Sequence, residues 1–450
     1  MQENNQLQTQ ENVEDIPTIY WHDYETWGAS PQKDRPSQFA GIRTDYNLNI
    51  IGEPLIEYCK PAPDYLPHPE ACLITGITPQ HALKHGLVEA EFMAKIHAEF
   101  SRPNTCVAGY NSIRFDDEVT RYSLYRNFYD PYEREWQNGN SRWDIIDLVR
   151  ACYALRPEGV EWPENDEGFI SFKLEHLTAA NGLSHESAHD ALSDVYATIA
   201  LAKLIKDKQP RLFEYAFSLK NKHTVSQQLD LSKPSVVLHI SSKLPAAQGC
   251  CTWVMPIAKH PTNANAVIAI DLSKSVDSII NDTPDTLREK LYAPREAFDN
   301  PSERPGVKLI HINRSPFLTT AKAMTEENAE RLGLDRETCL DNYRLLAATP
   351  DIAQKLYQLY DTEHVEHDED IDQALYSGGF LSDDDRRWCD RVIDAAPETL
   401  ALLAGETQHT GLRSLLFRYR ARNFPNTLTH DEMILEASLE APEKRIGKTL

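Results

Sequence analysis

The chain has 450 residues, of which 41% are hydrophobic and 9% aromatic, and its formal net charge at pH 7 is −23. This length predicts two to four globular domains, and the apolar content excludes an intrinsically disordered protein. The negative charge argues against a protein that binds nucleic acid over its whole surface, because such binding needs a basic surface. An acidic protein can still bind nucleic acid where its cations gather in one groove.

The N-terminal segment and the cysteines indicate the cellular compartment in which the protein is expected. Residues 1–15 are polar and acidic, which predicts a disordered tail and not a signal peptide. No apolar run approaches the length of a membrane span, so we expect no membrane contact. The eight cysteines form no CxxC pair and no framework spacing, which favours free thiols in a reducing cytoplasm.

Residues 16–209 alternate between strand and helix patterns, which is typical of an α/β domain. Strands are predicted at residues 18–23, 38–44, 50–59 and 105–110. Helices are predicted at residues 89–100 and 187–204, where apolar side chains recur at helical spacing.

The remainder of the chain divides into a β-rich part and a helical part. Residues 210–362 contain short strand patterns between turns, which predict a small barrel or sheet domain. These strands are predicted at residues 236–240, 253–257, 266–270 and 307–312. Residues 361–372 carry seven acids and no Lys or Arg, which predicts a solvated linker. Residues 363–450 then form a third domain with a helical pattern, for example at 413–422.

Two acids, Asp23 and Glu25, stand one residue apart in an apolar stretch near the N-terminus. Side chains alternate along a strand, so both carboxylates are expected on one face. Two buried carboxylates repel each other and lose hydration, and they are costly unless a cation neutralises them. Hard divalent cations such as Mg²⁺ prefer oxygen ligands, so this pair predicts a metal site.

More acids and a histidine follow where helices begin. Asp116 and Asp117 open a helix after a short strand, and either carboxylate could face the pair. His189 and Asp194 are five residues apart at the start of the next predicted helix. Five residues rotate by about 140°, so the two side chains share a face only if His189 lies at or before the first turn.

Other polar residues in these regions are expected to be structural. Ser184 and Ser187 are possible caps for the helix that follows them, and Asp190 is also expected to be a cap. For Asp144 and Asp147 we expect structural roles.

The pattern Asp23-x-Glu25, Asp116 after Phe115, and His189-x4-Asp194 resembles the DEDDh exonuclease superfamily. Longer segments resemble the bacterial exonuclease I family within it, over nearly all of the chain after residue 16. These segments are residues 22–26, 34–40, 73–80, 114–121, 126–132, 151–157 and 419–425.

The resemblance implies a fold and an activity. The expected architecture is a ribonuclease-H-like α/β exonuclease domain, followed by an SH3-like β domain and a helical C-terminal domain. The expected activity is processive 3′→5′ hydrolysis of single-stranded DNA to 5′-mononucleotides, in DNA repair or recombination. The implied partner is the C-terminal tail of single-strand DNA-binding protein, held by basic and apolar residues of the later domains. We expect the enzyme to be a monomer.

The resemblance also implies roles for the site residues. Asp23, Glu25 and Asp194 would hold one Mg²⁺, and Asp23 would bridge to a second ion that Asp116 helps to hold; Mn²⁺ is a plausible substitute. His189 would accept the proton of the attacking water, because an ordinary imidazole pKa near 6.5 suits that task. The family motif favours Asp116 over Asp117, which we expect to be a charge at a helix N-terminus.

A segment rich in arginine and aromatic residues suggests a path for the DNA. Residues 114–156 contain seven Arg, no Lys and nine aromatics, which suit phosphate contacts and base stacking. Eight acids in the same segment leave the alternative that many of these side chains are structural. With the resemblance, the expected substrate contacts are Glu25, Arg121, Tyr132, Trp136, Arg150, Arg156, Lys173, Lys222 and Lys308.

Two departures from the family pattern bear on how firmly DNA would be held. Lys173 stands where relatives are expected to have Arg, which keeps the charge but loses bidentate geometry. Family members also continue for about another helix beyond the segment around residue 425, whereas this chain stops at residue 450.

Three other functions remain open. An RNA exonuclease or oligonucleotidase could use the same metal site, since only a contact to the 2′-hydroxyl distinguishes the sugars. The chain could serve a polymerase in trans as a proofreading exonuclease. It could also be a single-strand-binding or partner-docking protein with an inactive site, although the presence of all five catalytic residues argues against this.

Overall fold

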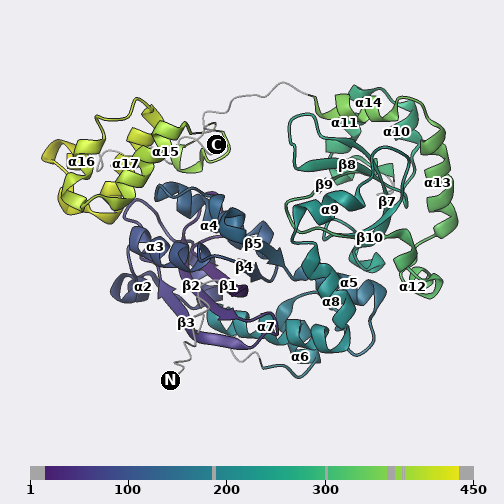
Figure 1. Cartoon of the computed structure of the whole chain (residues 1–450), viewed down its shortest axis with the longest axis horizontal. Coiled ribbons are helices and arrows are strands. Elements are labelled where there is room, and N and C mark those ends of the chain that lie inside the picture. Colours follow the sequence, from purple (N-terminus) through teal and green to yellow (C-terminus); the bar gives the residue numbers. More distant parts are fainter. Residues whose placement is uncertain are drawn as a thin grey trace, which may run out of the picture. The chain divides into compact units, whose positions relative to one another are not determined.

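The structure, a computed structural model of the chain, describes residues 16–184, 189–298, 303–361, 370–377, 379 and 381–434. The chain divides into two compact units, and Figure 1 shows their elements. Unit 1 comprises residues 1–141, 187–195 and 366–450, and unit 2 comprises residues 142–186 and 196–365. The predicted tail at residues 1–15, the possible cap Ser187 and the chain end at 435–450 lie outside the described residues.

The core of unit 1 is a mixed sheet. Strand β1 (Thr18–Thr26) pairs antiparallel with β2 (Pro36–Thr44) and parallel with β4 (Thr105–Gly109). Strand β3 (Ile50–Tyr58) pairs with β2, and the order of the sheet is β3-β2-β1-β4-β5. Its last strand, β5 (Ser141–Asp144), begins at Ser141 of unit 1 and continues into the first residues of unit 2. The first four strands confirm the predictions made from apolar patterning. β1 and β2 are buried almost throughout, as is typical of strands covered on both faces.

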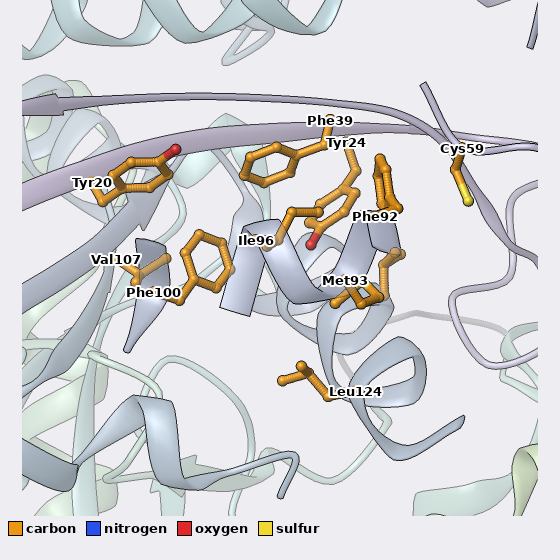
Figure 2. Packing of buried hydrophobic residues seen from close by; sticks show 11 residues of the cluster. Tyr20, Tyr24, Phe39, Cys59, Phe92, Met93, Ile96, Phe100, Val107 and Leu124 are labelled. Atoms are coloured by element: carbon orange, nitrogen blue, oxygen red, sulfur yellow. The ribbon is translucent and has the colours of Figure 1, made fainter. Parts of the chain in front are cut away.

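Helix α3 (Glu89–Phe100) covers one face of this sheet and confirms the predicted helix at 89–100. Its residues Phe92, Ile96 and Phe100 lie together with Tyr24 and Phe39 of the strands (Figure 2). The Tyr24 and Phe39 rings are 4.9 Å apart, centroid to centroid, in an edge-to-face arrangement. Each fully buried aromatic ring of this kind contributes about 1.5–3 kcal/mol, which fixes β1 firmly against α3.

Further helices complete unit 1. They are α1 (Pro69–Thr75), α2 (Pro79–His85), α4 (Asp116–Arg126), α15 (Asp383–Asp394), α16 (Leu400–Leu403) and α17 (Thr410–Asn423). Helix α17 confirms the helical pattern predicted at 413–422. The C-terminal helices form their own apolar cluster around Trp388, Leu415 and Leu416, and this cluster includes Phe128 from the segment after α4.

Unit 2 is built on a second sheet, which is antiparallel, in the order β10-β6-β7-β8-β9. Its strands are β6 (Val237–Ile240), β7 (Cys251–Lys259), β8 (Ala266–Asp271), β9 (Val307–His311) and β10 (Phe317–Thr320). Four of these confirm predicted strands. The sequence pattern missed β10, which has only four residues.

Unit 2 also contains helices, and one of them, α7, begins in unit 1, to which residues 191–195 belong. The helices are α5 (Ile146–Leu155), α6 (Leu174–Ala180), α7 (Ala191–Lys208), α8 (Pro210–Ser218), α9 (Lys222–Gln228), α10 (Asp277–Asn281), α11 (Pro284–Tyr292), α12 (Glu326–Arg331), α13 (Arg336–Ala348) and α14 (Ile352–Tyr360). α7 confirms the predicted helix at 187–204 but starts later. Helices α10 to α14 were not anticipated. Among the residues that the structure describes, none of the helices is long and apolar enough to cross a membrane.

The prediction of a solvated linker at residues 361–372 is wrong for Asp372. This carboxylate is buried and lies 3.1 Å from Arg35, 2.9 Å from Arg418 and 2.6 Å from Arg422. Burial alone would raise its pKa, but Arg35 and Arg422 outweigh burial and hold the pKa below its ordinary value. A run of acids can therefore contain a structural ion pair that composition does not reveal.

Candidate active site

Strand β1 presents Asp23 and Glu25 on the face opposite helix α3. Its alternate residues Tyr20, His22 and Tyr24 face the aromatic core, where the His22 ring lies 5.0 Å from that of Phe100. The acids between them therefore lie on the other face, as the spacing predicts. Glu25 is only 9% exposed although it carries a carboxylate.

Helix α4 brings a third carboxylate to this pair. Asp116, its first residue, accepts a hydrogen bond from the backbone N–H of Tyr24 at 3.0 Å. Burial and then the nearby charge of Asp116 raise the pKa of Asp23 well above its ordinary value. Asp117 instead lies 2.8 Å from Arg134, with both side chains buried. Of the two candidates, the structure thus places Asp116 with the pair and gives Asp117 a buried ion pair, which is more than a helix-terminal charge.

The start of α7 adds a histidine and a fourth acid. Ligand atoms of Glu25, His189 and Asp194 all lie within 4.8 Å of one another. His189 precedes the first residue of α7 by two positions, which satisfies the condition for sharing a face with Asp194. Its φ of 65° lies in the left-handed region, which is uncommon for a residue other than glycine and often marks functional sites.

Asp190 and Gln38 hold this turn in place. The backbone N–H of Ser193 donates to Asp190 at 3.2 Å, so Asp190 is a cap, as predicted. The side-chain amide of Gln38 donates to Asp190 at 3.3 Å and its oxygen accepts from the N–H of Ala191 at 3.4 Å. Gln38 is the register partner of Glu25 on β2, so it ties α7 to the strand that carries the acids. No pattern in the sequence indicates this role of Gln38.

The electrostatics of the site call for a cation. The pKa of Glu25 is raised to about 8, first by burial and then by the charges of Asp194, Asp116 and Asp190. Several carboxylates held together in a desolvated pocket repel one another, and a hard divalent cation relieves that repulsion. The set of oxygen donors and one imidazole therefore fits the binding of such ions.

Two of the expected DNA contacts are buried in ion pairs. Arg121 donates from Nε to Glu135 at 2.7 Å and from Nη1 to Glu118 at 2.9 Å, and its side chain is 5% exposed. Arg150 is also buried and donates to Asp147 at 2.7 Å. Because these guanidinium groups are already paired inside the protein, a contact with a phosphate would require them to share or leave those carboxylates.

Other expected contacts reach the surface. Trp136 is 64% exposed and Tyr132 is half-buried. In unit 2, the side chain of Lys173 is 68% exposed, and Lys222 is exposed at the start of α9. Burial, together with Lys274 and Lys243, lowers the pKa of Lys308 to about 8, against the opposing charge of Asp271.

Unit 2 contains a cavity of about 410 Å³ beside the exposed Arg156. Its lining combines apolar side chains with two arginines. The lining residues are Leu155, Arg156, Gln209, Pro210, Arg211, Leu212, Tyr215, Phe317, Thr319 and Ala323. Sequence reasoning singled out Arg156 but not the cavity, because its lining comes from segments more than 150 residues apart.

Comparisons with known proteins identify the family of the chain. The family model described as "Exonuclease" matches residues 20–202, that of the "Exonuclease I SH3-like domain" matches residues 220–362, and that of the "Exonuclease I C-terminal domain" matches residues 369–435. The chain is 50% identical to exodeoxyribonuclease I of Escherichia coli over 92% of this chain and 87% of that protein. It belongs to the exonuclease I family.

A second relative and several solved structures support the same family assignment. Exodeoxyribonuclease I of Haemophilus influenzae is 49% identical over 93% of this chain and 88% of that protein. E. coli exonuclease I in complex with a dA16 oligonucleotide superposes with a TM-score of 0.91 at 49% identity, covering 94% of this chain and 90% of that chain.

Two further solved structures carry other ligands. An "ExoI/SSB-Ct complex" has a TM-score of 0.89 at 48% identity, covering 95% of this chain and 90% of that one. A zinc-bound E. coli ExoI–ssDNA complex has a TM-score of 0.92 at 48% identity, covering 96% and 93%. As a member of this family, the chain is a nuclease with an exonuclease domain, an SH3-like domain and a helical C-terminal domain.

Proposed function

We propose that this exonuclease I family member degrades single-stranded DNA from its 3′ end, processively and with release of 5′-mononucleotides. The observation that carries the proposal is the convergence of Glu25, His189 and Asp194 within 4.8 Å, beside Asp23 and Asp116. The relatives named for this activity, and the relative crystallised with an oligonucleotide, support the choice of substrate.

Asp23, Glu25 and Asp194 would hold one divalent cation, and Asp23 with Asp116 would hold a second. Mg²⁺ is the ion that we propose, with Mn²⁺ as a substitute, because both accept oxygen ligands. A pair of such ions stabilises the attacking and leaving oxygens of an in-line displacement at phosphorus. The zinc-bound relative supports a divalent-metal site in the family.

The chain's own residues then have distinct tasks. His189 is exposed, so its imidazole can take the proton of an attacking water that enters from solvent. Asp116 fixes the carboxylate set to β1 through its bond with the Tyr24 N–H. Gln38 and Asp190 orient the turn that carries His189. Water supplies the nucleophile, so no covalent intermediate with the protein is required.

For the strand itself, we propose contacts of two kinds. Trp136 and Tyr132 of unit 1 offer aromatic faces on which unpaired bases stack without regard to sequence. Lys173, Lys222 and Lys308 of unit 2 offer positive charge, and Lys308 shares its surroundings with Lys243 and Lys274. The local cluster of Lys308, Lys243 and Lys274 answers the objection raised by the net charge of −23.

We also propose that the cavity beside Arg156 receives the C-terminal tail of single-strand DNA-binding protein. The cellular role that we propose for the enzyme is DNA repair in the cytoplasm. An apolar cavity bordered by Arg156 and Arg211 suits a peptide that ends in an apolar side chain and a free carboxylate. The relative solved with such a tail supports the partner. Arg211→Glu should abolish peptide binding by fluorescence anisotropy while leaving hydrolysis of naked DNA unchanged.

The decisive experiment is digestion of 5′-labelled single-stranded DNA and of its RNA counterpart, each with Mg²⁺ and with EDTA. We expect a metal-dependent ladder that shortens from the 3′ end on DNA alone. Equal decay of RNA would favour an oligonucleotidase. No decay of either substrate, by a protein that still binds single strands, would favour a binding protein with an inactive site.

A further inference from the structure

Three consecutive acids begin helix α4, and each has a partner on a different element of unit 1. Asp116 accepts from the N–H of Tyr24 on β1, and Asp117 pairs with Arg134 of the segment after α4. Glu118 accepts a hydrogen bond of 2.6 Å from the hydroxyl of Tyr376. The first turn of α4, which carries the carboxylate that we assign to the second metal ion, is thus fixed partly by a residue more than 250 positions away.

Tyr376 belongs to residues 370–377, which we call the strap. Its hydroxyl also accepts a hydrogen bond from Nη1 of Arg121 at 3.1 Å, and Arg121 in turn donates to Glu118 at 2.9 Å. The ring of Tyr376 packs edge-to-face on that of Tyr122, with centroids 5.9 Å apart. The strap therefore closes a ring of charge-assisted hydrogen bonds with α4, and such bonds are stronger and more directional than neutral ones.

The strap reaches the other end of the same helix through buried charges. Arg126, in the last turn of α4, donates to Glu89 at 2.7 Å. Glu89 also accepts from Arg35 at 3.4 Å, and Arg35 donates to Asp372 of the strap at 3.1 Å. Both ends of α4 are thus tied to one short segment of the C-terminal part of the chain.

We infer that Tyr376 is a positioning residue for the metal site, acting through Glu118 and the first turn of α4 on Asp116. The inference rests on the proposed function, because it assumes that Asp116 holds a divalent ion. Residues that orient the ligands of a metal ion contribute to the affinity of the site for that ion, even when they do not contact the ion. The C-terminal part of the chain would then contribute to the metal site as well as to the fold.

The test compares Tyr376→Phe with the unaltered protein. The substitution removes only the hydroxyl and keeps the ring that packs on Tyr122. We expect Mn²⁺ binding without DNA, measured by calorimetry, to weaken by roughly 3- to 30-fold, the range that networks of this kind transmit. The Mg²⁺ concentration for half-maximal hydrolysis should rise by a similar factor, while single-strand affinity in EDTA stays the same.

Two further variants make the outcome decisive. Glu118→Gln should shift the Mg²⁺ midpoint in the same direction, and it carries the test if Tyr376→Phe does not fold. Tyr343→Phe is the matched control, because that hydroxyl donates to the carbonyl of Pro234 in unit 2, and it should leave the midpoint in place. A lower melting temperature with an unchanged metal midpoint in both variants would reduce the strap to a structural role and overturn the inference.

Failure of the proposed function would look different. In that case the unaltered protein itself would bind no Mn²⁺, or would bind it equally well after Asp194→Asn. If the unaltered protein binds Mn²⁺ and loses it on Asp194→Asn, while Tyr376→Phe changes nothing, only the inference about the strap fails.

Discussion

Replacing Asp194 by Asn should make the metal-free protein more stable while destroying its activity. The pKa of Glu25 stands at about 8 against an ordinary 4.5, and among the neighbouring charges Asp194 is the largest cause. A shift of 3.5 units, at 1.36 kcal/mol each, corresponds to roughly 5 kcal/mol by which the fold opposes ionisation of Glu25. Burial is the largest cause and Asp194 the second, so we assign about 1–2 kcal/mol, roughly one pKa unit, to Asp194.

The sign of the effect depends on pH. An acid whose pKa is raised by folding destabilises the fold once it ionises, so the cost begins near pH 4.5 and is complete above pH 8. In EDTA at pH 9, Asp194→Asn should therefore melt roughly 2–6 °C higher than the unaltered protein. The difference should vanish near pH 4.

Divalent ions should reverse the order of the two melting temperatures, so that the unaltered protein melts higher than Asp194→Asn. Metal that binds only the native state stabilises the unaltered protein, whereas the variant lacks a ligand and gains little. Hydrolysis by the variant should fall by at least about a hundredfold. The assay is differential scanning fluorimetry at several pH values with EDTA or Mg²⁺, with the exposed ion-pair residue Asp341→Asn as control. An Asp194→Asn protein no more stable than its parent in EDTA at pH 9 would refute the reasoning.

Three further predictions follow from burial and exposure. Metal binding should release close to one proton per site at pH 6.5 and progressively fewer above pH 8, because the pKa of Glu25 is raised to about 8; calorimetry in buffers of different ionisation enthalpy measures this release. Trp136→Ala should raise the dissociation constant for single strands in EDTA by roughly 5- to 150-fold and leave the rate at saturation unchanged; an equal dissociation constant would remove Trp136 from the DNA path. Asp372→Ala should lower the free energy of unfolding by about 3–5 kcal/mol in urea titrations, because it removes the buried carboxylate that three guanidinium groups share and leaves Arg35 with Glu89 and Arg422 with Asp64; a loss below 1 kcal/mol would contradict that role.

The sequence predicts the fold well wherever apolar patterning is regular. Helix α3 has the predicted bounds because its apolar residues keep helical spacing. Of the ten strands in the part of the chain that the structure describes, eight were predicted to within a few residues. Strand β10 has four residues, too few for alternation to be recognised. Helices α10 to α14 were not predicted, because short strand patterns between turns are the more regular signal in residues 210–362.

The candidate catalytic residues could be predicted from the sequence for a different reason. Asp23 and Glu25 show by their alternation alone that they share a face, and a buried pair of ionised acids is costly unless a proton or a cation neutralises the charge. The choice between Asp116 and Asp117 required the family motif, since adjacent residues of a first turn look alike in sequence. Only the structure shows that Arg134 pairs with Asp117 and leaves Asp116 for the site.

The arginine-rich segment shows what composition cannot reveal, because composition counts charges and not their partners. Residues 114–156 hold seven arginines and eight acids, and the structure pairs several of them inside the protein: Arg121 with Glu135, Arg134 with Asp117, and Arg150 with Asp147. A buried guanidinium that loses its carboxylate to reach a phosphate would leave that carboxylate uncompensated, at a cost of several kcal/mol. We therefore expect single-strand binding by this segment to depend more on the exposed face of Trp136 than on its buried arginines, and we expect lysines elsewhere in the chain to supply positive charge for the phosphates.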